Sequence, residues 1–152
     1  MTTDIGFCNL EDNLTKAAEI MWQKDCGVVP IVDEEQKVVG MITDRDICIA
    51  AATRNQKTSD IKAKEMINGE IIGCVASDDI ETALKKMRKN QLKRLPITGE
   101  NGELVGMLSI ADILLCGQKA KKLRKKIYLT LKAIGTSRPI VLKEISDNRH
   151  LC

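Results

Sequence analysis

The chain has 152 residues, of which 43% are hydrophobic and 30% are charged, and this composition excludes a disordered chain because it can bury a core. The longest unbroken apolar run, Ile47–Ala52, has six residues, far fewer than the roughly 20 of a transmembrane helix. The net charge of +3 hides an uneven distribution, because residues 1–113 carry 14 basic and 19 acidic groups whereas residues 114–152 carry 10 and 2.

Few residues are suited to metal binding or catalysis. Six cysteines are scattered without a CxxC pair, and His150 is the only histidine, so we expect no metal site and reduced, buried thiols. The sequence has no nucleophile–base signature, so we expect no catalytic residues and no enzyme. No charged-then-apolar leader opens the sequence, and we expect a cytoplasmic protein. Three aromatic residues are too few to stack single-stranded nucleic acid.

The first predicted elements occupy residues 14–52. Apolar side chains at helical spacing predict an amphipathic helix: Leu14, Ala17, Ala18, Met21 and Trp22. An apolar strand follows over residues 28–32, and Pro30 within it favours a strand start or an edge strand. A polar turn at 33–37 leads to a second strand at 38–43, and a second helix begins near Asp44.

The same order of elements recurs 66 residues later. A polar connector over 53–63 and a short segment at 64–67 lead to a second apolar stripe: Ile80, Ala83, Leu84 and Met87. Strands are predicted at 95–98 and 104–109, joined by a turn containing Asn101-Gly102, a strong hairpin signal. In a gapless alignment of 8–47 with 74–113, 12 of 40 positions are identical. We therefore predict two copies of one α-β-β-α unit, at 1–60 and 61–116, packed through their sheets. Residues 1–3 correspond to the segment that precedes the second copy.

The C-terminal extension, residues 117–152, differs from the repeats in charge. Six of the eight residues from Lys119 to Lys126 are basic, and apolar residues recur every three or four positions from Ala120 to Ile134. This pattern predicts a basic amphipathic helix that ends near Gly135 and Pro139. Its apolar side can pack on the repeats or on a second copy. Alternatively, its lysines can bind nucleic acid or an anionic membrane.

Two segments carry a resemblance to a known family. Residues 40–47, preceded by 29–33, resemble the cystathionine β-synthase (CBS) domain, and residues 106–113, preceded by 96–97, resemble it again. The resemblance implies an α/β (α+β) fold in which the pair forms one Bateman module with two clefts between the copies. It also implies binding of adenosine compounds: AMP, ADP or ATP, and in some members S-adenosylmethionine or NAD. Such modules regulate and need no further cofactor.

The ligand motif of that family is glycine, two apolar residues, Ser or Thr, two residues and Asp. Both copies have it: Gly40 with Thr43 and Asp46, and Gly106 with Ser109 and Asp112. Glycine allows close approach of a flat base, the helix N-terminus favours phosphate, and the carboxylate can accept hydrogen bonds from ribose hydroxyls. The same Thr/Ser-x-x-Asp spacing also fits a capping box, in which these groups only satisfy the first amides of the helix. The sequence leaves both interpretations open.

Further site residues follow from the resemblance. Lys93 and Arg94 match positions at which other members place basic residues on phosphates, and Arg45 lies within the first motif. Val28 and Gly73 are candidates for the wall of the base pocket. Because Gly27 and Val28 stand where the second copy has Lys93 and Arg94, the two clefts should differ in charge.

These observations favour a stand-alone CBS pair that senses an adenine nucleotide, acts on a regulated protein partner and forms a two-fold homodimer. Two alternatives stay open at this point. The first is a dimerisation scaffold with empty clefts, and the second is a nucleic-acid-binding protein that uses the basic helix.

Overall fold

The structure is a computed structural model that describes residues 1–116 and 121–136. The first copy contains β1 (Cys8–Asn9), α1 (Leu14–Gln23), β2 (Val28–Val32), β3 (Val38–Thr43) and α2 (Asp44–Thr53). After the short 3-10 helix η1 (Ala63–Met66), the second copy contains β4 (Cys74–Val75), α3 (Ile80–Asn90), β5 (Arg94–Thr98), β6 (Leu104–Ser109) and α4 (Ile110–Cys116). The basic helix α5 (Lys121–Gly135) follows.

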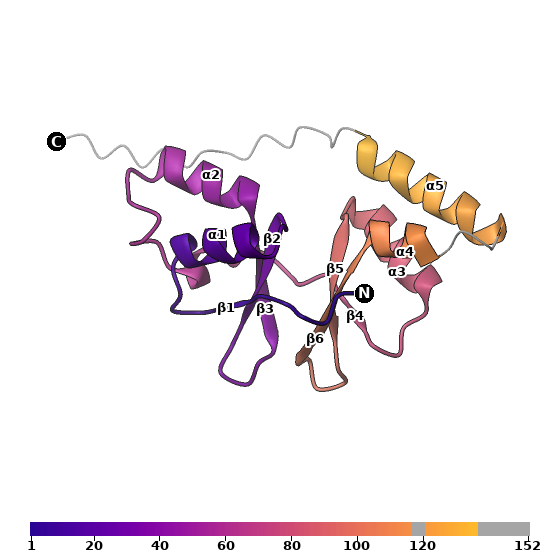
Figure 1. Cartoon of the computed structure of the whole chain (residues 1–152), viewed down its shortest axis with the longest axis horizontal. Helices are drawn as coiled ribbons and strands as arrows, with labels where there is room; N and C mark the ends of the chain where they lie inside the picture. Colours follow the sequence, from indigo (N-terminus) through magenta and orange to yellow (C-terminus); the bar gives the residue numbers. More distant parts are fainter. Residues whose placement is uncertain (117–120, 137–152) are drawn as a thin grey trace.

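The internal repeat is a structural repeat. The sheets have the orders β1-β2-β3 and β4-β5-β6, with a parallel pair followed by an antiparallel pair in each. Even the irregularity in the hairpin register recurs, after Ile31 in one copy and after Ile97 in the other. Figure 1 shows the two sheets side by side at the centre, with the helices of each copy on the outer sides. This arrangement confirms the predicted mixed α/β fold of two pseudo-symmetric units.

Each unit contains one strand that the sequence pattern did not predict. The strands β1 and β4 have only two residues each, too few for an alternating pattern, so the unit is β-α-β-β-α. Because of β1, Pro30 lies on the middle strand of its sheet rather than on an edge or at a strand start. A proline is tolerated there because β1 pairs only with Ile31 and Val32, so no strand lies alongside β2 at Pro30 on that side.

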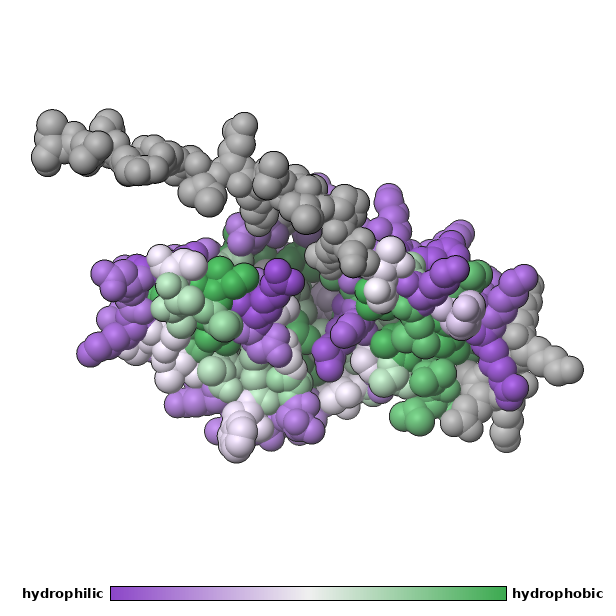
Figure 2. All heavy atoms as spheres, turned by 90° about the horizontal axis from the view of Figure 1, so that it is seen from above, coloured by the Kyte–Doolittle hydropathy of each residue, from purple (hydrophilic) through white to green (hydrophobic). Residues whose placement is uncertain are grey.

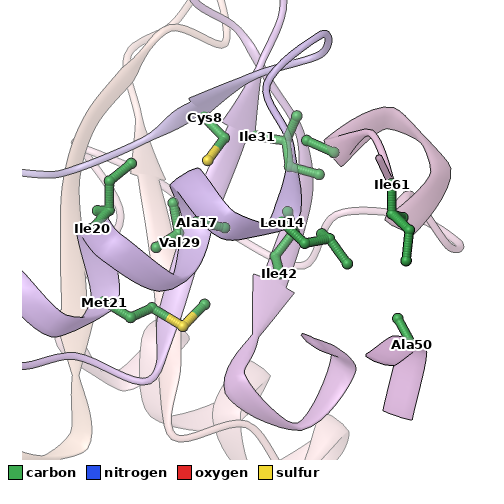
Figure 3. Packing of buried hydrophobic residues seen from close by; sticks show 11 residues of the cluster. Cys8, Leu14, Ala17, Ile20, Met21, Val29, Ile31, Ile42, Ala50 and Ile61 are labelled. Carbon is green, nitrogen blue, oxygen red and sulfur yellow. The ribbon is translucent and has the colours of Figure 1, made fainter. Parts of the chain in front are cut away.

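Each copy has its own hydrophobic core between its helices and its sheet. In the first copy, α1 buries Leu14, Ala17, Ile20 and Met21 against the sheet (Figure 3). The prediction was wrong for two residues of the stripe, because Ala18 is exposed and Trp22 is 88% exposed. Met21 occupies the inward position on that turn, and the following residue is rotated by about 100° away from the core.

Hydrogen bonds join the two copies at their sheets. The backbone of Thr2 exchanges two hydrogen bonds of 3.0 Å with that of Met107 in β6. Near the turns, Leu104 N–H donates to the Gln36 carbonyl at 3.0 Å. The N-terminal segment therefore crosses to the second copy and pairs with its sheet.

The helix α5 packs on the second copy through its apolar side. Ile127 is 2% exposed and belongs to the core cluster of that copy, with Leu123 partly buried against the cluster. The Gln91 side chain after α3 donates to the Ala133 carbonyl of α5 at 2.8 Å, and Lys126 forms an ion pair with Glu81. The predicted amphipathic helix is confirmed, and its neighbours are α3 and α4. Residues 117–120 and 137–152, including Pro139, lie outside the described residues.

No group of three or more His, Cys, Asp or Glu side chains within 1–116 and 121–136 could hold a metal ion. No helix in the same ranges has the length and apolar character needed to cross a bilayer. The five cysteines in these ranges are free, but the expectation of buried thiols was wrong for Cys48 and Cys116, which are exposed. Burial, followed by the nearby Asp12 carboxylate, raises the pKa of the Cys8 thiol to about 11.

Candidate functional site

The first candidate site is the junction between β3 and α2. Thr43 ends the strand and caps the helix, because its hydroxyl oxygen accepts a hydrogen bond from Asp46 N–H at 3.2 Å. In return, one oxygen of the Asp46 carboxylate, Oδ2, accepts from the Thr43 backbone N–H at 2.9 Å and from its hydroxyl at 2.6 Å. The hydroxyl and carboxylate predicted to bind a ribose are thus adjacent, in a complete capping box.

The junction between β6 and α4 repeats this geometry. Asp112 Oδ2 accepts from the Ser109 backbone N–H at 2.8 Å and from its hydroxyl at 2.7 Å, and Ser109 Oγ accepts from Asp112 N–H at 3.0 Å. The other carboxylate oxygen, Oδ1, lies 3.4 Å from the Met1 ammonium nitrogen. Burial favours a raised pKa for Asp112, but the Ser109 hydrogen bonds and the ammonium together outweigh burial and lower it. Asp112 is therefore held as an acceptor.

The motif glycines lie against side chains of the segments that precede the two copies. A Cβ atom on Gly40 would lie 2.8 Å from Ile31 Cδ1 of its own hairpin and 3.0 Å from Ile67 Cγ1, and one on Gly106 would lie 2.6 Å from Met1 Sδ. Met1 and Ile67 are themselves 66 residues apart, so each copy's preceding segment lies against the glycine of the other copy's motif. They are site neighbours that the motif analysis missed, because the 66-residue offset shows that the two segments are equivalent but not which residues they contact.

The second site has basic residues close to its helix cap. Arg94 is opposite Ser109 in the β5–β6 register, and the Lys93 carbonyl accepts from Ile110 N–H at 2.9 Å. Both side chains are exposed. The structure therefore brings the predicted basic pair to the edge of the Ser109–Asp112 junction.

At the first site, the Asp44 carboxylate lies beside Gly27, which is the counterpart of Lys93 at the second site. Val28 is opposite Thr43 in the β2–β3 register, and Asp44 Oδ2 would lie 3.0 Å from a Cβ atom on Gly27. Arg45 is exposed in the first turn of α2, and its backbone N–H donates to Asp44 Oδ1 at 2.7 Å. The two junctions therefore share their caps and differ in charge, as the sequence predicted.

Gly73 lies against Pro96 of the strand β5. A Cβ atom on Gly73 would lie 2.8 Å from the Pro96 carbonyl oxygen, and the Gly73 carbonyl accepts from Lys86 Nζ at 2.8 Å. Its role as a wall of a base pocket stays a prediction.

Comparison with known proteins decides the family. The family model described as "CBS domain" matches residues 1–52 and 63–117. The chain belongs to the CBS-domain family. Among curated relatives, the uncharacterised protein YlbB of Bacillus subtilis is 30% identical over 123 residues, which are 78% of this chain and 79% of YlbB. Two further curated relatives are much longer archaeal enzymes, of which this chain spans only 23% and 21%.

Solved CBS structures share the fold. A crystal structure of Hypoxic Response Protein I with two coordinated zinc ions is similar with a TM-score of 0.70 at 30% identity, covering 76% of this chain and 92% of that one. The CBS domain pair of protein MJ0100, in complex with 5'-methylthioadenosine and S-adenosyl-L-methionine, gives a TM-score of 0.65 at 26% identity, covering 76% and 93%. The two units described above are therefore a CBS pair.

Proposed function

We propose that this CBS pair is a regulatory module that binds adenosine compounds at its two strand-to-helix junctions and performs no chemistry itself. The observation that carries the proposal is the duplicated hydroxyl–carboxylate pair at a helix N-terminus, Thr43 with Asp46 and Ser109 with Asp112. A ribose hydroxyl can replace the Ser or Thr hydroxyl as a donor to the carboxylate, so the capping box is a resting state of the site. The relative that binds S-adenosylmethionine and methylthioadenosine supports this ligand class.

Charge suggests a division between the sites. We assign an adenine nucleotide, AMP, ADP or ATP, to the second site, because Lys93 and Arg94 stand beside its helix cap. Asp44 beside Gly27 disfavours phosphates at the first site, which suits a ligand with no phosphate, such as S-adenosylmethionine. Arg45 is the base nearest to the Thr43 cap in sequence and can still serve a nucleotide, and NAD is a further candidate ligand.

If Asp46 and Asp112 hold the ligand, replacing them should remove the stabilisation that the bound ligand gives to the folded chain. At 100 times its Kd, a bound nucleotide should stabilise the folded chain by about 2.7 kcal/mol. The double substitution Asp46→Asn and Asp112→Asn should abolish this gain, because the amide is a weaker acceptor than the carboxylate. Thermal unfolding with and without AMP, ADP, ATP, NAD and S-adenosylmethionine measures the effect, and the single variants locate each ligand.

Asp79→Asn is the matched control for that experiment. Asp79 caps α3 by accepting from Thr82 N–H at 2.6 Å, so its substitution makes the same chemical change at a helix cap outside the motif. Because asparagine caps a helix about as well as aspartate, the substitution should change the melting temperature little and leave the ligand-induced shift intact. Ligand shifts that persist in the Asp46/Asp112 double variant would contradict the assignment.

A second experiment tests the phosphate contacts. Replacing Lys93 and Arg94 by alanine should weaken ATP binding at least tenfold, because each phosphate loses charge-assisted hydrogen bonds, and should leave adenosine binding nearly unchanged. Isothermal titration of both ligands gives the ratio. An equal loss for ATP and adenosine would show that the two bases serve only the fold.

We further propose a two-fold homodimer, a regulated protein partner and a cytoplasmic location, with 1–60, 61–116 and 117–152 as the functional divisions of the chain.

A nucleic-acid-binding role for the basic helix α5 is the weaker alternative, because α5 uses its apolar side to pack on α3 and α4. A gel-shift assay over a salt series tests it, since nucleic-acid binding falls steeply with salt.

A further inference from the structure

A groove on the first copy lies between α1, the loop after it and the start of α2. Its volume is about 490 Å³, and its lining includes four apolar side chains and two carboxylates: Ala18, Met21, Trp22, Ile47, Asp25 and Asp44. Trp22 borders the groove with most of its side chain in solvent. Among the described residues, the Trp22 ring is the largest aromatic surface that is exposed to solvent.

The equivalent place on the second copy is filled by α5. The repeat counterparts of Ala18, Met21 and Ile47 are Leu84, Met87 and Ile113. All three are buried in the cluster that contains Ile127. The counterpart of Asp25 is Gln91, whose side chain donates to the Ala133 and Thr136 carbonyls at the end of α5. The groove is therefore the open counterpart of a surface that, in the same chain, holds an amphipathic helix.

The charges of the groove identify the kind of helix it fits. Asp25 and Asp44 make it acidic, whereas the second copy has Gln91 and Ile110 at these positions. The outer side of α5 exposes Tyr128 and Leu131, and Lys125 and Lys132 are exposed on the same helix. An apolar, basic helix surface and an apolar, acidic groove are complementary.

We propose that the chain forms a two-fold dimer in which α5 of each subunit lies in the α1–α2 groove of the other. Helices α2 and α5 lie along the same upper edge of the molecule, at opposite ends (Figure 1). Seen from above, apolar side chains gather in separate areas on the two halves (Figure 2). A two-fold axis can therefore form both contacts at once. Groove-to-groove pairing would instead bring the carboxylates of two subunits together. This inference specifies how the homodimer of the proposed function assembles.

Charge reversal tests the arrangement. The groove variant (Asp25→Lys with Asp44→Lys) and the helix variant (Lys125→Glu with Lys132→Glu) should each weaken dimerisation at least tenfold, measured by sedimentation equilibrium. In this two-fold arrangement, mixing the two variants restores a tight heterodimer, because both contacts again join opposite charges. The chain that carries all four substitutions should also recover its self-association. Circular dichroism melting of each variant confirms that it is folded.

Glu34→Lys with Glu100→Lys is the matched control, since both residues are exposed in the turns of the two hairpins and the charge change is the same. It should leave dimerisation within about twofold. If the groove variant bound the parent chain at least as tightly as it bound the helix variant, the two grooves would pair with each other, and the proposal would be overturned. A dimer that tolerates both variants would place the interface elsewhere. A parent chain that stays monomeric would remove the homodimer itself, while leaving the nucleotide-binding proposal intact.

Discussion

Replacing Leu123 and Ile127 by aspartate should lower the melting temperature of the chain, even at high salt. Ile127 is 2% exposed and Leu123 packs against the same core cluster. Burial of such a side chain is worth about 1.5–3 kcal/mol, and a carboxylate at the same place adds a desolvation cost. We expect a loss of roughly 3–5 kcal/mol in the free energy of unfolding for the pair.

Salt separates the apolar contribution from the charged one. An exposed ion pair such as Lys126 with Glu81 contributes about 0–1 kcal/mol, and salt screens it further. The loss should therefore persist in 1 M salt, at which the Debye length is about 3 Å. Thermal and urea unfolding at low protein concentration, with and without salt, measure it.

Leu129→Asp is the matched control for this experiment. Leu129 is on the same helix and undergoes the same chemical change, but it is 37% exposed, so the cost should stay under about 1 kcal/mol. Unchanged melting of the Leu123/Ile127 variant would mean that α5 is not docked in solution. Loss of nucleic-acid binding on charge reversal of Lys125 and Lys126 would then make the nucleic-acid-binding role of α5 the leading function.

Truncation of the two equivalent isoleucines should have unequal costs. Ile113 is 1% exposed in the core cluster that α5 completes, and its repeat counterpart Ile47 lines the open groove of the first copy. Ile113→Ala should cost about 2–5 kcal/mol, because it leaves a closed cavity. Ile47→Ala should cost less than half as much, because water or neighbouring side chains can enter the space.

Urea unfolding of both variants, below the concentration at which the chain self-associates, gives the two free energies. Each variant is the control for the other, since they change the same residue at the same position of the repeat. Equal costs would contradict the conclusion that α5 covers this position in the second copy while the groove of the first copy is open. A larger cost for Ile47→Ala that appears only at high protein concentration would instead support a helix bound in the groove.

The local elements were predictable because short-range physics specifies them. The strands at 28–32, 38–43 and 104–109 have the predicted bounds, and α2 begins at Asp44 as expected. The Thr43–Asp46 and Ser109–Asp112 pairs were identified because a capping box depends only on residues three positions apart. Comparison of the chain with itself then revealed the repeat, and the resemblance of both copies to the CBS domain indicated the family.

Contacts between distant segments were decided only by the tertiary structure. Met1 and Ile67 reach the motif glycines of the opposite copy, and β1 and β4 exist only because each has a partner strand more than 20 residues away. Periodicity also predicted an apolar side for α5 without saying which copy it would contact. The structure places it on the second copy, where Leu84 replaces Ala18 and Leu92 replaces Cys26. Larger apolar side chains at these positions offer more area to bury, and this difference in packing leaves the first copy's groove open.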